Sequence, residues 1–370
     1  MAVRLKDIAR DLGVSVVTVS KVLRGNADIG EATRRRVLKR MKELNYQPNM
    51  LARGLASGRT FTVGLVVPDL VHPFFAEFAK SLGGVLRTSK RALILASSEE
   101  DPAVEQQEIR TLLSRGVDVL LIASCQANLR NFYELGDERT PYLLFDRDFP
   151  HLAAHFVGSD NVQVGEMATK HLIEIGRTRI GHIGGKNTSP AFDRLRGYKK
   201  ALAETGLAAP ENYVVVRERV EESGDALGFE AMQELLKLES RPDAVFCYND
   251  LTALGAMDAT LKAGLRVPED IAFIGCGNLR YANYLRVPLS SIDHGTAELG
   301  RIAGEFALEL SAKPEQEPRS ILVPPTLVAR ESTVGIGVRA GNEEKTFKHS
   351  QLAGFGVCPR LCGTVFGTIS

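Results

Sequence analysis

The 370-residue chain contains no tryptophan and only five cysteines. Cys125, Cys247, Cys276, Cys358 and Cys362 are odd in number and widely spread, without metal-ligand spacing, so we expect reduced thiols and no metal site. A zinc or redox role for the last two, the only close pair, is the alternative. No apolar run reaches the ~18 residues of a membrane helix. The charged N-terminus MAVRLKDIAR lacks an apolar signal segment, which predicts a cytoplasmic protein.

Motifs that would indicate an enzyme are also missing. The sequence has no P-loop, no G-x-S-x-G and no metal-binding cluster. The stretch GCGNLR superficially resembles a dinucleotide fingerprint, but it lacks the third glycine and a suitable acidic residue downstream. We therefore expect no catalytic residues, no cofactor and no enzymatic activity.

The net charge of +1 conceals a segregated distribution. Residues 1–60 hold 13 Lys and Arg against 5 Asp and Glu, whereas the other 310 residues hold 33 against 40. A basic head on an acidic body indicates that the head binds a polyanion. The alternative is a solvated helix face that happens to be basic.

The basic head has the apolar spacing of three short helices. Residues 5, 8, 9 and 12 are apolar at helical spacing, Gly13 ends that helix, and Ser15 is a suitable N-cap for a second one. A third helix follows, with Val37, Met41 and Leu44 on its inner face. Two helices joined by a tight turn predict a helix-turn-helix.

The second helix, within GVSVVTVSKVLRG, has an outer face suited to base recognition. At 100° per residue one side of the helix collects apolar residues and points inward. These inward residues are Val19, Val22 and Leu23. Val17, Ser20 and Lys21 then face outward, with Val16 on the flank. In the major groove, apolar groups contact thymine methyls and lysine reaches guanine. A structural helical hairpin with two exposed valines is the alternative.

The stretches LKDIARDLGVSVVTVSKVLRG and TRRRVLKRMKELNYQPNMLARGL resemble the DNA-binding head and hinge of the lactose-repressor (LacI/GalR) family. The resemblance is continuous over residues 4–60, and similar features extend to about residue 335. It implies a DNA-contacting helix in which Val16, Val17 and Lys21 read bases. Ser15, at the helix start, and Thr18 and Ser20, which hold phosphates, complete this set. Gly30 stands where the family commonly has a serine N-cap, a change that costs only tenths of a kcal/mol.

The segment QPNMLARGLASGRT can form only a short helix. Pro48 ends the preceding helix, Asn49 can cap a new one, and Gly58 ends it about two turns later. The family resemblance implies a hinge helix that folds in the minor groove of the operator, with Leu55 as the wedge between base pairs. Its DNA-contacting residues would be Asn49, Ala52, Arg53 and Leu55. A plain interdomain linker is the alternative.

Beyond residue 60, short apolar strands alternate with amphipathic helical stretches. The strands are FTVGLVV, ALILAS, VDVLLIA, YLLFD, RIGHIGG, YVVV, AVFCYN and IAFIGC. This alternation predicts parallel sheets covered on both faces, and about 275 residues favour two doubly wound subdomains. The family resemblance implies a fold similar to periplasmic sugar-binding proteins, with an effector in the cleft between them.

Polar and aromatic residues that follow the strands are candidates for effector binding, because ligands bind beyond the carboxyl ends of such strands. The candidates are Phe74, Phe75, Asp146, Arg147, Asn161, Asn249 and Asp250. A turn or helix cap is the alternative for each, and it is favoured for Asp160.

The family resemblance adds Arg194, in the pattern R-L-x-G-aromatic, as the residue that clamps the effector, and it adds Ser124. One departure concerns Gly277, which stands where many members have an aspartate that binds a sugar hydroxyl. Losing a buried acceptor changes specificity strongly, so a simple hexose effector is not assumed.

These observations predict four segments: a helix-turn-helix domain (1–48), a hinge (49–60), an effector-binding and dimerisation body (61–338) and a disordered tail (339–370). Because the tail has no leucine heptads, we expect a two-fold dimer rather than a tetramer. The predicted protein is a cytoplasmic, nucleoid-associated regulator, most simply a repressor. Its partners are a palindromic double-stranded operator and a sugar-like effector, with no membrane. The alternatives are a solute-binding protein, or a co-repressor-dependent regulator with a ligand such as a nucleobase.

Overall fold

The N-terminal head is a three-helix unit. In the computed structural model, the described residues are 3–24, 26–46, 54, 59–126, 129, 132, 135, 140–149, 151–220 and 223–335. The head consists of α1 (Leu5–Leu12), α2 (Val16–Arg24) and α3 (Glu31–Glu43). Buried Ile8, Val19 and Val37 meet at its centre. The predicted hinge contacts Asn49, Ala52, Arg53 and Leu55, and the tail from residue 336, lie outside the described residues.

The helix ends follow from local sequence. Gly13 adopts a left-handed conformation (φ +64°) and caps α1, which directs the chain into the tight turn before α2. Gly30 occupies the N-cap of α3 without a side-chain hydrogen bond, as its sequence predicts. On α3, Val37 and Met41 are buried, which confirms the predicted inner face.

The body contains two six-stranded sheets. Sheet A has the order β11-β5-β4-β3-β1-β2, and all its pairings are parallel. Its strands are β1 (Thr62–Val67), β2 (Ala92–Ser97), β3 (Val119–Ile122), β4 (Tyr142–Phe145), β5 (His155–Ser159) and β11 (Ser320–Val323).

Sheet B has the order β12-β10-β9-β8-β6-β7, and only the β10–β12 pair is antiparallel. Its strands are β6 (Ile180–Gly185), β7 (Val214–Arg217), β8 (Ala244–Cys247), β9 (Ala272–Cys276), β10 (Ser290–Asp293) and β12 (Thr326–Val328). Strand β10 was absent from the predicted set because its Ser290 and Ser291 break the apolar pattern, although both are buried.

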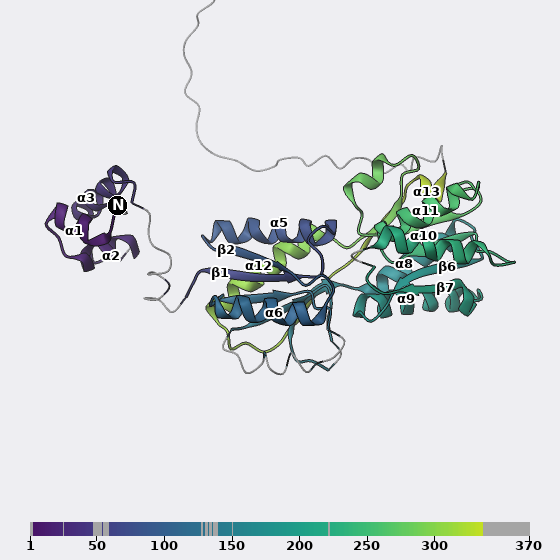
Figure 1. Cartoon of the computed structure of the whole chain (residues 1–370), viewed down its shortest axis with the longest axis horizontal. Coiled ribbons are helices and arrows are strands. Elements are labelled where there is room, and N and C mark those ends of the chain that lie inside the picture. Colours follow the sequence, from purple (N-terminus) through teal and green to yellow (C-terminus); the bar gives the residue numbers. More distant parts are fainter. Residues whose placement is uncertain are drawn as a thin grey trace, which may run out of the picture.

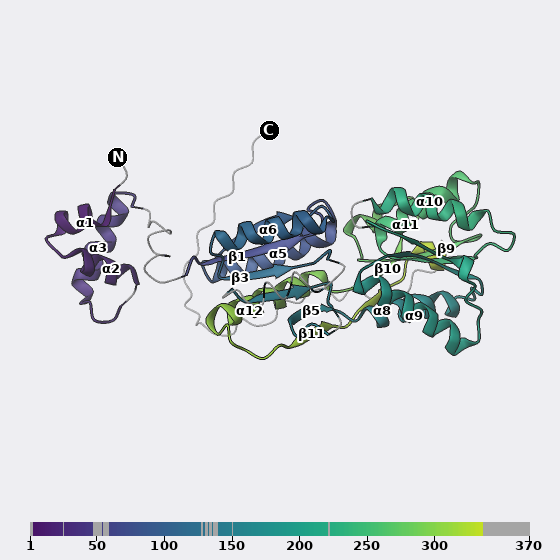
Figure 2. The same cartoon turned by 60° about the horizontal axis from the view of Figure 1, so that its bottom comes forward.

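Helices cover both faces of each sheet (Figures 1 and 2). On sheet A, α5 (Pro73–Thr88) and α12 (Thr296–Ala312) share one core, and α6 (Pro102–Ser114) packs into the other. On sheet B, α8 (Asn161–Glu174) and α9 (Ser189–Thr205) cover one face, and α10 (Gly224–Leu236) and α11 (Asp250–Lys262) cover the other. The short helices are η1 (Glu211–Tyr213), η2 (Arg280–Tyr284) and α13 (Glu331–Val334). The predicted fold class, a helical head plus two doubly wound subdomains, is confirmed.

We call the units built on sheets A and B subdomain A and subdomain B. The chain passes between them three times: from β5 to α8, from β10 to α12, and from β11 to β12. The intervening segments are residue 160, residues 294–295 and residues 324–325. Three short connections on one side make a hinge about which the subdomains can close. Among the described residues, no helix is long and apolar enough to cross a membrane.

Candidate DNA-binding head and ligand cleft

Helix α2 presents apolar side chains to solvent at its N-terminal end. Val16 and Val17 are 44% and 60% exposed, whereas Val19 and Val22 of the same helix are buried. The hydroxyl of Ser15 accepts a hydrogen bond from the backbone N–H of Thr18 at 3.0 Å, which caps the helix. An exposed apolar face on a short capped helix matches the requirement for contact with thymine methyl groups.

The same helix contains one prediction that is wrong. Leu23 was expected on the inner face, but its side chain is 36% exposed. Val19 and Val22 fill the core between the helices, and Leu23, one residue or 100° beyond Val22, turns toward the edge.

Lys21 is held on the outer face by an acidic residue. Its Nζ lies 2.5 Å from Oδ2 of Asp28, and both side chains are partly exposed. The hydrogen bond from Lys21 lowers the pKa of Asp28. Exposed ion pairs contribute little to stability, so Lys21 can exchange this partner for a base or a phosphate at small cost.

A narrow pocket, which we call the cleft, lies between the two subdomains. Its lining residues are His72, Phe74, Asp146, Arg194, Asn249, Asp250, Cys276, Gly277, Leu279 and His294. The first three belong to subdomain A, the next six to subdomain B, and the last to the connection between β10 and α12. The cleft is therefore at the carboxyl ends of both sets of strands, where the sequence predicted a ligand site.

Arg194 is the buried cation of this cleft. Its Nε donates to Oδ1 of Asn161 at 2.9 Å, and its Nη1 donates to the carbonyl oxygen of Tyr248 at 2.6 Å. Its guanidinium also stacks on the Tyr248 ring, 4.6 Å from the centroid. These contacts fix the guanidinium before any ligand arrives, which is the arrangement expected of a ligand clamp.

Asn161, Asn249 and Asp250 all lie at helix starts that follow strands. Asn161 holds Arg194 and is not among the residues that line the cleft. Asn249 lines the cleft and also caps α11, because its Oδ1 accepts from the backbone N–H of Thr252 at 2.8 Å. Asp160 is the N-cap of α8, which is the structural role that its sequence favoured.

Asp250 is a buried carboxylate at the floor of the cleft. Its Oδ1 accepts from Oγ of Ser291 at 2.6 Å, and its Oδ2 accepts from the backbone N–H of Leu279 at 2.7 Å. Burial raises the pKa of Asp250 to about 6 despite these hydrogen bonds. Asp250 therefore shapes the turn that carries Gly277 and Leu279.

Phe74 and Phe75, which were both predicted to contact the effector, point in different directions. Phe74 lines the cleft, whereas Phe75 points into the core of subdomain A and meets Phe145 edge to face. Adjacent residues of a helix point 100° apart, so only one of the two faces the ligand space. The expectation for Phe75 as an effector contact is corrected accordingly.

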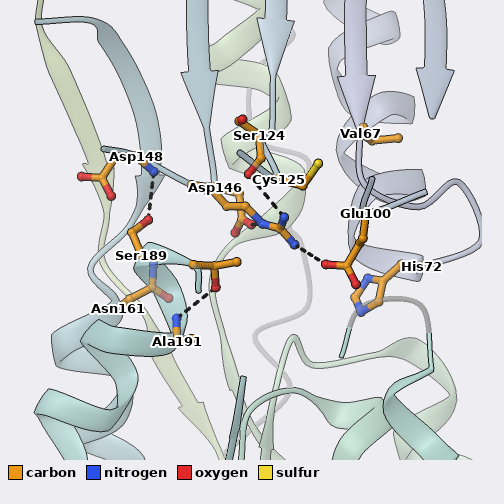
Figure 3. A network of polar contacts seen from close by, with 12 residues as sticks. Val67, His72, Glu100, Ser124, Cys125, Asp146, Asp148, Asn161, Ser189 and Ala191 are labelled. Carbon is orange, nitrogen blue, oxygen red and sulfur yellow. Dashed lines mark hydrogen bonds and ion pairs between the residues drawn. The ribbon is translucent and has the colours of Figure 1, made fainter. Parts of the chain in front are cut away.

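Arg147 and Ser124 take part in a buried network beside the cleft and do not line it (Figure 3). Arg147 pairs with Glu100 at 3.2 Å and donates to the carbonyl oxygen of Ser124. The hydroxyl of Ser124 donates to the fully buried Glu105 at 2.6 Å. Asp146, the residue before Arg147, does line the cleft. Arg147 and Ser124 thus support the wall behind it.

Sequence reasoning missed His72, Cys276, Leu279 and His294 as residues of the cleft. The rule that located the others could have found two of them, because Cys276 ends β9 and His294 directly follows β10. Cys276 belongs to an apolar strand that was read as core, and β10 was not predicted.

Hydrogen bonds between described residues join the subdomains around the cleft, including one between Nδ2 of Asn249 and Nε2 of His72 at 3.4 Å. The backbone N–H of Asp148 donates to Oγ of Ser189 at 2.9 Å, as Figure 3 shows. Nη2 of Arg219 donates to the carbonyl oxygen of Glu99 at 3.0 Å. These bonds hold the subdomains together across the space where a ligand would lie.

Comparison with known proteins identifies both parts of the chain. Residues 4–49 match the model for bacterial regulatory proteins of the lacI family, and residues 169–333 match the periplasmic binding protein-like domain. The ribose operon repressor of Haemophilus influenzae is 36% identical over 329 residues, which cover 89% of this chain and 98% of that protein.

Solved structures give the same result over the whole body and head. A transcriptional regulator CelR–cellobiose complex matches with 30% identity and a TM-score of 0.68, covering 89% of this chain and 99% of that one. The Lac repressor bound to ONPG in the repressed state matches with 25% identity and a TM-score of 0.79, covering 90% and 100%. The chain therefore belongs to the lacI family of bacterial regulatory proteins, which are DNA-binding regulators controlled by small-molecule effectors.

Proposed function

We propose that the protein is a dimeric repressor that binds a palindromic operator and changes its operator affinity when an uncharged sugar occupies the cleft. The observation that carries this proposal is the fixed, buried guanidinium of Arg194 in a cleft between two subdomains, in a chain whose α2 exposes Val16, Val17 and Lys21. Since the chromosome is the partner, the protein acts in the cytoplasm. The bound molecule is a signal and leaves the cleft unchanged.

The charges around the cleft favour an uncharged ligand. Arg194 is the one arginine or lysine among the lining residues, and Asp146 and Asp250 carry the opposite charge. Burial lowers the pKa of His294 and raises that of Cys276 to about 12, so both are neutral near pH 7. A phosphate would bring its two charges next to these carboxylates, whereas hydroxyl groups can bond to amide, imidazole and carboxylate alike.

Exposed apolar residues on both subdomains support a homodimer. Strand β2 is an edge of sheet A, and its Leu95 is 41% exposed. Val71, in the loop after β1, is 85% exposed, and Tyr284 of η2 is 87% exposed. Large apolar side chains at a sheet edge are typical of surfaces that pair with another chain.

The connections between subdomains suggest how the ligand acts on the head. Effector binding changes how far subdomain B closes on subdomain A about the three connections. In a dimer, this closure changes the distance between the starts of the two β1 strands. Hinge segments attached there would fold on DNA at one spacing and not at the other. The equilibrium moves only by the difference in the ligand's affinity for the two states.

The test is a thermal-shift screen with sugars, sugar acids, sugar phosphates and nucleobases, followed by operator binding. A ligand at ~100 times its Kd adds about 2.7 kcal/mol to the folded state, which raises the Tm measurably. We expect an uncharged sugar to raise the Tm of wild type and not that of Arg194→Ala. The sugar assignment would be wrong if only nucleobases or phosphorylated sugars stabilised the protein, and the regulator itself would be wrong if no DNA sequence were preferred.

A further inference from the structure

His294 occupies an unusual place in this molecule. It lies on the two-residue connection between β10 of subdomain B and α12 of subdomain A, it is buried, and it lines the cleft. Its ring contacts the ring of Phe74 from subdomain A, with centroids 5.5 Å apart. Its Nε2 lies 3.3 Å from Sγ of Cys276 in subdomain B. One imidazole therefore touches both subdomains at their hinge.

The backbone opposite His294 leaves space for a ligand group. A Cβ added to Gly277 would lie 3.9 Å from Nε2 of His294 and 4.0 Å from Oδ2 of Asp250, with no closer neighbour. Gly277 has φ +123°, a conformation that side chains rarely adopt. No side chain enters this space from position 277, so the polar atoms that face it come from His294 and Asp250.

The carboxylate of Asp250 and the imidazole of His294 differ in the hydrogen bonds that they can form. Each oxygen of Asp250 already accepts one hydrogen bond, from Ser291 or from Leu279, and keeps a second acceptor site. A neutral imidazole has one N–H donor and one acceptor nitrogen, whereas a carboxylate only accepts. A hydroxyl group both donates and accepts, and of the two groups beside Gly277 the imidazole is the one that can donate or accept, according to its tautomer.

We propose that His294 is a specificity-determining residue that binds one hydroxyl group of the effector in the space left by Gly277, with Cys276 positioning its ring. This inference rests on the proposed function and adds to it the residue that reads the sugar. Because His294 lies on one of the three connections between the subdomains, a ligand bound to it also contacts the hinge.

Burial, aided by nearby positive charge, keeps the His294 ring in its neutral form. Burial is the main cause of the lowered pKa of His294, and the nearby Arg194 and His72 lower it further. The Cys276 thiol is also neutral near pH 7, because burial raises its pKa to about 12. The pair therefore presents uncharged hydrogen-bonding groups, which suits a hydroxyl better than an ionised ligand.

The experiment is a cycle between protein variants and deoxy sugars, measured by isothermal titration calorimetry on the full chain. The probes are D-ribose, D-xylose, D-glucose and D-galactose, each with its monodeoxy analogues. In wild type, one deoxy analogue of the bound sugar should bind about tenfold more weakly than its parent, the cost of one hydrogen bond. In His294→Ala the affinity for the parent sugar should fall by the same factor, and the deoxy analogue should bind with an affinity no lower than that of the parent sugar.

Two further variants distinguish recognition of the ligand hydroxyl from a general defect in folding. His294→Gln keeps a donor and an acceptor, so it should retain discrimination against that analogue even if affinity changes. His155→Ala removes a similarly buried histidine far along the chain, on β5 and absent from the cleft lining, and it should bind every sugar as wild type does.

Each other outcome overturns a defined claim. If a sugar binds but His294→Ala discriminates against every deoxy analogue as wild type does, His294 does not read a hydroxyl. If none of the four sugars or their analogues binds wild type, this inference is wrong. If the same protein still binds its operator, the proposed function as a DNA-binding regulator is retained and only the assignment of the ligand is wrong.

Discussion

Gly165 on α8 is the position where a single methyl group should separate two helices. A Cβ added there would lie 2.0 Å from the carbonyl oxygen of Arg194 on α9, and one on Gly197 would lie 2.1 Å from that of Val162. Ordinary contact begins near 3.4 Å, so Gly165→Ala requires the helices to move apart by more than 1 Å. Overpacking of this kind costs about 1–3 kcal/mol.

This cost should be visible in thermal unfolding. For a domain of 150–250 residues, each kcal/mol shifts the Tm by about 2–4 °C, so Gly165→Ala should unfold roughly 2–12 °C below wild type. Gly84→Ala on α5 is the matched control, because a Cβ there would meet only Nη2 of Arg87, at 3.8 Å. The control should be neutral or more stable by about 1 kcal/mol, since alanine favours helix over glycine.

The same substitution should weaken effector binding, because the backbone that moves is that of Arg194. Sugar affinity, measured by calorimetry at a temperature where the variant is folded, should fall in Gly165→Ala and be unchanged in Gly84→Ala. A Gly165→Ala protein with the Tm of wild type would refute the close helix contact. A destabilised variant with unchanged sugar affinity would refute the role of Arg194 as a clamp.

Three further substitutions test other parts of the molecule. Lys21→Ala should reduce the preference for operator over scrambled DNA by roughly 10- to 100-fold, because a base contact contributes about 1–3 kcal/mol of discrimination. Fluorescence anisotropy measures both affinities, and an unchanged preference would show that Lys21 does not contact a base. Asp118 accepts hydrogen bonds from the backbone N–H groups of Thr60 and Phe61, where the body begins, and pairs with Arg91 at 2.9 Å. Asp118→Ala should lower the free energy of unfolding, measured in urea, by about 3 kcal/mol. A loss below about 1 kcal/mol would contradict the stabilising role of these contacts. Burial raises the pKa of Asp250 from 3.8 to about 6, so its ionisation costs the fold about 3 kcal/mol, a cost that is absent well below pH 3.8 and complete well above pH 6. The Tm of Asp250→Asn relative to wild type should therefore rise between pH 4 and 7, and a flat difference would contradict the buried charge.

The fold was largely predictable because its signals are local. Apolar strands such as β3 and β8, buried on both faces, stand out against amphipathic helices, and Gly13 marks the turn of the head. Strand β10 was missed because its buried serines are satisfied by distant partners, as when Ser290 donates to the carbonyl oxygen of Arg330. Such pairings depend on tertiary structure and leave no periodic signal.

The cleft was predictable in its location but only partly in its residues. Strand ends pointed to Asp146, Asn249 and Asp250 because parallel strands bring their carboxyl ends together. Which neighbour faces the ligand depends on side-chain direction, and so Phe74 lines the cleft while Phe75 enters the core. His294 directly follows β10, so the strand-end rule did not point to it because β10 itself was not predicted.

Operator binding with and without sugar, compared between wild type and Arg194→Ala, tests the central claim most directly. The DNA would be a fragment selected from random sequence by the wild-type protein, and the sugar would be the one that raises its Tm. We predict that the sugar shifts the operator affinity of wild type by about fivefold or more, as allosteric coupling of 1–3 kcal/mol requires, and leaves that of Arg194→Ala unchanged. An equal shift in both proteins, or no sequence preference in either, would contradict the account.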